Sequence, residues 1–136
     1  MGRTETITFT IPGKPIGKPR MTQRDKWYKR KATTDYWEWK ELVKSIATNV
    51  PPAAQVVSLS WIAYFTPPAS WSAKRRIAVI GQLHRSKPDR DNIDKALLDA
   101  LFDDDAAIAA GSLEKRWSEN ARLEVTIIRN RSLADV

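Results

Sequence analysis

Apolar and polar residues alternate over residues 4–11, where Ile7, Phe9 and Ile11 share one face and threonines occupy the other. Alternation with a period of two is typical of a strand that buries one face. A similar run at residues 55–65 predicts a second strand. Its apolar face consists of Val57, Leu59, Trp61, Ala63 and Phe65.

Three other segments favour helices. Residues 34–48 carry an apolar stripe at helical spacing, and a helix is also expected from Asn92 onwards with Asp91 as its N-cap. The stripes consist of Tyr36, Trp39, Leu42, Val43 and Ile46 in the first helix and of Ile93, Ala96, Leu97, Ala100 and Leu101 in the second. A short basic helix is predicted at residues 70–80, ended by Gly81.

The last two predicted strands are residues 107–117 and 122–129, and the short turn between them predicts a hairpin. No internal repeat or linker divides the chain. We therefore expect one domain over residues 1–136, with an α+β fold in which helices flank a mixed sheet.

Charge is distributed unevenly along the 136 residues, whose net charge is +7. Residues 1–31, a basic arm that includes the first strand, contain nine basic and two acidic residues and so hold the whole excess. Such an arm suits a polyanion, because each neutralised phosphate releases counterions. The alternative is a solubilising tail, and Trp27 and Tyr28 either stack on bases or anchor the arm in the core.

Composition also excludes several classes of protein. No apolar run approaches the roughly 20 residues that span a membrane, and no phosphate-binding loop pattern predicts a nucleotide cofactor. The absence of cysteine excludes disulfides and cysteine-ligated zinc, and it is compatible with a reducing cytoplasm.

The most informative stretch is residues 87–105. Asp89 and Asp91 point to the same side of an extended segment, and Lys95 follows one helical turn later. Three acids, residues 103–105, end the stretch. If one of them folds back onto the pair, Mg²⁺ or Mn²⁺ would offset the repulsion between carboxylates. The alternative is that the pair caps a helix and the three acids form a solvated turn.

This stretch resembles the RusA family of Holliday-junction resolvases. The matching segments are residues 7–15, 87–89, 91–92, 95–96, 98–101 and 114–117, with His84 and the later pair of acids. The resemblance implies a homodimeric, Mg²⁺-dependent endonuclease, with Mn²⁺ as a substitute, that nicks four-way DNA junctions in recombination and repair. It also implies a cytoplasmic protein encoded by a bacterium or a phage.

Roles for individual residues follow from the same resemblance. By position, Asp89, Asp91 and Asp105 correspond to metal-binding aspartates, with Asp104 as an alternative ligand, and Lys95 corresponds to an essential lysine. By their chemistry and position, Asn92 and Asp99 are expected to support Lys95 or a metal-bound water.

The expected DNA contacts follow instead from the positions of the basic residues and of the single histidine: Lys14, Lys18, Arg20, Arg24, Lys74, Arg75, Arg76, His84 and Lys87. For the cations of residues 74–76 the alternative is an exposed helix face, and for His84 a plain surface histidine.

Two features depart from the family. Phe102 alone separates Leu101 from Asp103, and Ala107 stands where the family commonly has Gln. These departures motivate a second hypothesis, in which a protein of the same fold binds junctions but has lost cleavage. A nuclease specific for flaps or other branches is a third.

Overall fold

The computed structural model of the protein describes residues 3–19 and 31–131. Its elements, in chain order, are β1 (Arg3–Pro12), α1 (Lys31–Ile46), a short 3-10 helix η2 (Ala53–Gln55), β2 (Val56–Phe65), α2 (Ala73–Val79), α3 (Arg90–Leu101), β3 (Leu113–Trp117) and β4 (Arg122–Arg131). No helix among these residues has the length and hydrophobicity needed to cross a bilayer.

The four strands form one mixed sheet in the order β1-β4-β2-β3. β4 is antiparallel to both of its neighbours, whereas β2 and β3 are parallel. The expected α+β fold with a mixed sheet is therefore confirmed. The predicted hairpin is wrong, because β2 lies between the two strands that were expected to pair.

The path around β2 explains this difference. The chain before β3 runs along β2, where the Leu59 N–H donates to the Ala110 carbonyl at 3.0 Å and the Trp61 N–H donates to the Ser112 carbonyl at 3.0 Å. A Cβ at Gly111, whose φ is +152°, would overlap the Leu59 carbonyl, so only glycine fits there. The turn after β3 then passes the end of β2, since the Ser118 N–H donates to the Phe65 carbonyl at 2.9 Å.

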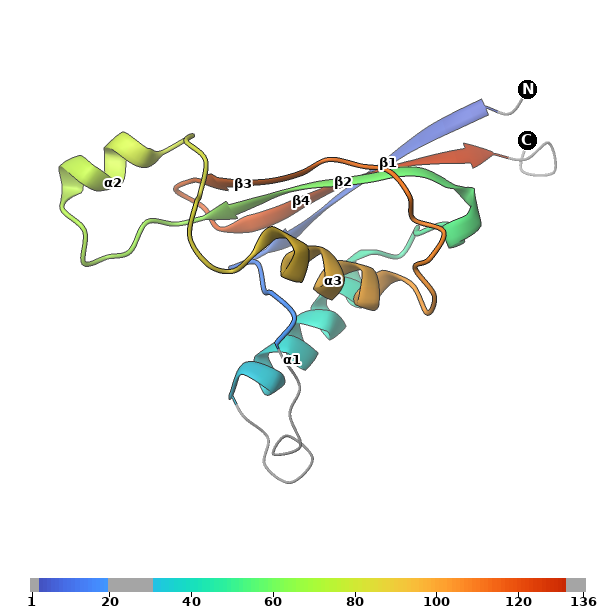
Figure 1. Cartoon of the computed structure of the whole chain (residues 1–136), viewed down its shortest axis with the longest axis horizontal. Helices are drawn as coiled ribbons and strands as arrows, with labels where there is room; N and C mark the ends of the chain where they lie inside the picture. Colours follow the sequence, from blue (N-terminus) through green and yellow to red (C-terminus); the bar gives the residue numbers. More distant parts are fainter. Residues whose placement is uncertain (1–2, 20–30, 132–136) are drawn as a thin grey trace.

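The core lies between the sheet and the helices α1 and α3, which cover the same face of the sheet (Figure 1). Its strand residues alternate as predicted except at Val57, which is 43% exposed because the pairing of β2 shifts between Val56 and Ser58. Each large apolar side chain buried in the core stabilises the fold by about 1.5–3 kcal/mol. The largest fully buried side chains are Trp61, Tyr36, Ile11, Leu59, Ile93, Leu97, Leu123, Ile127, Val43 and Val125. Helix α2 instead projects away from the sheet (Figure 1).

The start of α3 differs by two residues from the prediction. Asp89, not Asp91, occupies the N-cap position, and Asp91 lies in the first helical turn. The physical reason is that Pro88 disfavours helix only at the residue before it, Lys87, so the helix can begin at Arg90. Both aspartates therefore lie at the N-terminal end of α3, which is called its first end below.

Candidate metal and nucleic-acid site

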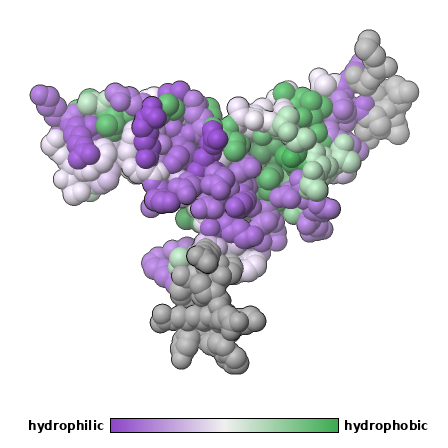
Figure 2. All heavy atoms as spheres, in the orientation of Figure 1, coloured by the Kyte–Doolittle hydropathy of each residue, from purple (hydrophilic) through white to green (hydrophobic). Residues whose placement is uncertain are grey.

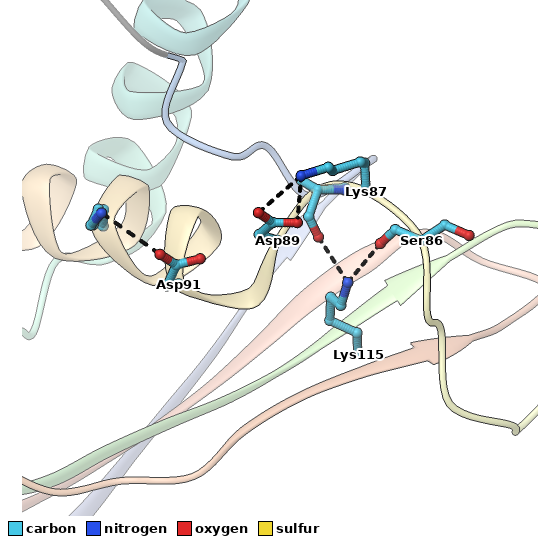
Figure 3. A network of polar contacts seen from close by, with 7 residues as sticks. Ser86, Lys87, Asp89, Asp91 and Lys115 are labelled. Carbon is cyan, nitrogen blue, oxygen red and sulfur yellow. Dashed lines mark hydrogen bonds and ion pairs between the residues drawn. The ribbon is translucent and has the colours of Figure 1, made fainter.

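Asp89 is the last residue before α3, and no helix amide engages its carboxylate. Its backbone is extended (φ −67°, ψ 145°), and its side chain makes no capping hydrogen bond. Lys87, whose peptide bond to Pro88 is cis, places its Nζ 2.9 Å from Oδ1 and 3.0 Å from Oδ2 of Asp89 (Figure 3). Both side chains are exposed, so other cations can reach the carboxylate.

Asp91 lies two residues further on and faces Lys95, as the sequence predicted. The Lys95 Nζ is 3.7 Å from Oδ2 of Asp91 (Figure 3), and the two side chains are 62% and 70% exposed. An exposed pair at this spacing contributes only about 0.3–0.5 kcal/mol. A phosphate or a metal ion can therefore separate the two side chains at little cost.

Lys115 lies beneath this segment and comes from β3. Its ammonium donates to the carbonyl of Ser86 at 2.6 Å and to that of Pro88 at 2.8 Å (Figure 3). Burial lowers the pKa of Lys115, the charge of Asp89 opposes this shift, and Lys87 adds to it. Sequence reasoning gave this residue no role. The available signal was its position two residues from both Leu113 and Trp117, on the face of β3 that points toward the helices.

The three acids that follow α3 lie at its opposite end. The helix has 12 residues and so spans about 18 Å. Residues 103–105 are exposed, and Oδ1 of Asp104 accepts from the Ala106 N–H at 3.0 Å. Across residues 3–19 and 31–131, no three His, Cys, Asp or Glu side chains gather closely enough to hold one metal ion. Within one chain, therefore, Asp104 and Asp105 do not fold back onto Asp89 and Asp91.

Asp99, in the last turn of α3, is bound by two other parts of the fold. Its Oδ2 accepts from the Lys18 ammonium at 2.7 Å and from the Tyr36 hydroxyl at 2.9 Å. Burial alone would raise the pKa of Asp99, but these two hydrogen bonds outweigh it and the net shift is downward. The support expected from Asp99 for Lys95 is therefore replaced by contacts to Lys18 and Tyr36.

Lys18 joins the loop after β1 to α3 rather than standing free for DNA. Besides its bond to Asp99, its backbone N–H donates to the Asn92 carbonyl at 2.9 Å. At Gly17, a Cβ would approach the Cβ of Pro88 to 3.0 Å, so the loop packs directly against the segment before α3. Lys18 and the backbone of Asn92 thus hold the loop after β1 against α3.

The family of the chain follows from comparison with known proteins. A family model described as endodeoxyribonuclease RusA matches residues 12–128. The chain belongs to the RusA family. The match includes the aspartates at both ends of α3, Lys95 and Lys115. No curated protein matches the chain at a significant level.

Cations surround the first end of α3 in this RusA domain. Lys14 and Lys87 line a hollow of about 340 Å³ between the loop after β1 and the segment before α3. Helix α2, which projects away from the sheet, carries three further exposed cations, Lys74, Arg75 and Arg76, and the Arg75 guanidinium lies 3.5 Å from the centroid of the Trp71 ring. Figure 2 shows hydrophilic side chains over α2 and the start of α3. The predicted contacts Arg20 and Arg24 lie outside the described residues.

His84 is a packed aromatic residue, and its burial does not support a contact with DNA. It is only 5% exposed, and its ring stacks on Phe65 at 4.1 Å between centroids and meets Trp117 at 4.3 Å. Burial lowers the pKa of His84, and the charge of Lys115 lowers it further. The imidazole is therefore neutral near pH 7.

Proposed function

We propose that this RusA-family protein is a Mg²⁺-dependent endonuclease that nicks four-way DNA junctions during recombination and repair. The nuclease activity is supported by the family to which the chain belongs. The observation that carries the rest is the pair of exposed carboxylates at the start of α3, with the Lys95 ammonium 3.7 Å from Asp91. Cations on the loop after β1 and on α2 supply the charge that a DNA backbone needs.

Asp89 and Asp91 suit a hard cation. Mg²⁺ is usually bound through one or two carboxylates, together with waters and substrate phosphates. Neither carboxylate is buried, and that of Asp89 is free of capping bonds. Bound there, the ion supplies Lewis-acid chemistry that activates water and offsets charge on the leaving oxygen. Lys95 turns from Asp91 to the phosphate and stabilises the charge that develops on it.

A second copy of the chain completes each site in this proposal. Residues 103–105 stand about 18 Å from the pair along their own helix, so any aspartate of this group that joins the metal comes from another chain. Four exposed alanines follow the acids and suit contact with a partner: Ala106, Ala107, Ala109 and Ala110. A two-fold dimer would hold two equivalent sites, one for each of two opposing strands of a junction.

Cleavage of a labelled four-way junction with Mg²⁺ tests the proposal. We expect paired nicks from the wild type and none from Asp89→Asn or Asp91→Asn, because each variant loses a carboxylate ligand. The loss should exceed the roughly 10–100-fold typical of losing a residue that only supports a ligand. Both variants should bind the junction as before, since no basic residue changes. Glu41→Gln, an exposed change on α1, is the control, and near-normal turnover in both aspartate variants would contradict the proposed site.

The same assay decides between this proposal and a junction-binding protein without cleavage. That alternative is favoured by Ala107, an exposed apolar residue where the family commonly has Gln, and by the separation of the acids within one chain. Junction binding without nicks at any Mg²⁺ concentration would establish it. Flap and linear duplex substrates at equal salt would reveal a nuclease of broader preference.

A further inference from the structure

Residues 85–88, which lead into Asp89, pack against the loop at Gly17 through Pro88 but make few hydrogen bonds to the rest of the fold. Among the described residues, no backbone–backbone hydrogen bond involves residues 85–88. Pro88 has no N–H to donate, and Lys87 and Asp89 bind each other rather than a neighbouring element. The Asp89 carbonyl accepts from the Asn92 and Ile93 N–H groups of α3, at 3.1 and 3.2 Å, so residue 89 is held by the helix whereas residues 85–88 need an anchor from a side chain.

Lys115 supplies that anchor. Its ammonium donates to two carbonyls of the segment, those of Ser86 at 2.6 Å and Pro88 at 2.8 Å, and so links it to β3. β3 itself is held by its pairing with β2, where Lys115 lies opposite the buried Ala63. A lysine in this place uses two of its three donors on the backbone immediately before Asp89.

We propose that Lys115 is a positioning residue for the metal site: its ammonium fixes the backbone of residues 86–88 so that Asp89 presents its carboxylate beside Asp91. This inference rests on the proposed function, in which these two aspartates hold the metal. The two bonds are made to main-chain carbonyls, so the requirement is for a long side chain that ends in a donor. Loss of that donor should loosen Asp89 and weaken metal binding, whereas the DNA-contacting cations stay in place.

Direct Mn²⁺ titration of the full chain without DNA tests the inference, alongside nicking measured against Mn²⁺ concentration. Lys115→Met keeps the length of the side chain and removes its donors. We expect Mn²⁺ binding about 10–100-fold weaker. High Mn²⁺ should restore nicking, and junction affinity in EDTA should be unchanged. Lys44→Met on α1 is the matched control, because Lys44 is an exposed lysine whose nearest acid is 3.9 Å away.

A residue that merely stabilises the fold would change the unfolding midpoint without shifting the Mn²⁺ dependence. Should Lys115→Met fail to fold, Lys115→Gln, which keeps a donor on a shorter chain, should show an intermediate loss of Mn²⁺ affinity. Wild-type Mn²⁺ affinity in either folded variant would overturn the inference while leaving the proposed function intact. A wild-type protein that neither binds Mn²⁺ nor nicks junctions would overturn both.

Discussion

Both ends of α3 carry aspartates, but their surroundings differ. At the first end, Asp89 and Asp91 each have a lysine partner, Lys87 and Lys95 respectively. At the other end, residues 103–105 make no ion pair with any described residue. The helix dipole adds to the contrast, since it favours anions at the start of a helix and disfavours them at its end by about 0.3–1 kcal/mol.

The different surroundings of Asp89 and Asp91 and of residues 103–105 suggest different roles for the two groups of acids. The fold stabilises the first pair through neighbouring lysines and the start of the helix. It gives nothing comparable to residues 103–105, where three like charges follow one another in an unfavourable place. Side chains that break a local rule without compensation are often functional. A cation from outside the chain, or a metal shared with a second copy, would supply the missing charge.

Mixing two inactive variants is the strongest way to break this comparison. Asp89→Asn and Asp105→Asn should each abolish nicking alone, whereas their mixture should recover it. In a mixed dimer that shares acids between chains, one site carries both substitutions and the other carries none. Roughly half of randomly assembled dimers are mixed. Nicking of a labelled junction after co-refolding provides the measurement.

A mixture of Asp89→Asn with Asp91→Asn is the matched control. Both residues lie at the same end of α3, so every site in that mixed dimer contains a substitution and no activity should return. Equal inactivity of the two mixtures would show that the acids do not combine across chains.

Substitution of Asp99 should have an effect of intermediate size, because its carboxylate is bound by both Lys18 and Tyr36. Asp99→Asn removes the ion pair with Lys18, whose side chain is 37% exposed while that of Asp99 is 32% exposed. We expect a loss of about 1 kcal/mol in the free energy of unfolding, less than the roughly 1.5–3 kcal/mol of hydrogen bonds to charged groups, because water screens the pair. Urea unfolding at neutral pH measures this change. Tyr36→Phe removes only the hydrogen bond from Tyr36 to Asp99, so it measures that contribution separately.

The pH dependence of that loss has a defined sign. The pKa of Asp99 is lower in the folded protein than its ordinary value of 3.8. Its charge therefore stabilises the fold fully above that value, and the stabilisation disappears as pH falls through the folded-state pKa. The gap between wild type and Asp99→Asn should close on acidification below about pH 4. A gap that stays constant would mean that Asp99 acts through packing alone.

The smallest expected effects lie at the helix ends. Asp103→Asn should raise the free energy of unfolding by about 0.3–1 kcal/mol, because it removes a negative charge from the unfavourable end of α3. Asp91→Asn should lower it by a similar amount. Thermal unfolding of the two variants at low salt compares the signs, and changes of equal sign would remove the electrostatic contrast.

Sequence patterns predicted which elements form but not their order in the sheet, and the strand expected from residue 107 begins only at Leu113. The alternation in β2 and β4 and the stripe of α3 depend on local burial, which the sequence displays directly. Which strand pairs with β3 does not follow from local burial, because the short turn at residues 118–121 suits either a hairpin or a passage around the end of β2. The requirement for glycine at position 111 indicates the second path, but only when the position of the Leu59 carbonyl is known.

The candidate site was predictable to the same extent. Asp91 and Lys95 lie one turn apart on one helix, so their spacing predicted their contact. The expected extended pair of Asp89 and Asp91 was wrong, because Asp91 lies in the first turn of α3. Lys115 was missed because its partners are backbone carbonyls about 27–29 residues away, which no side-chain pattern encodes. The burial of His84 likewise depends on Phe65 and Trp117 meeting around it.

The position of β4 has a consequence for synthesis. Residues 122–131 leave the ribosome after the other three described strands, yet they fill the interior of the sheet between β1 and β2. Until they arrive, β1 has no partner strand and β2 has one open edge. Such distant pairings fold slowly, and exposed edges invite aggregation. A nascent chain therefore has to remain soluble until β4 has been synthesised.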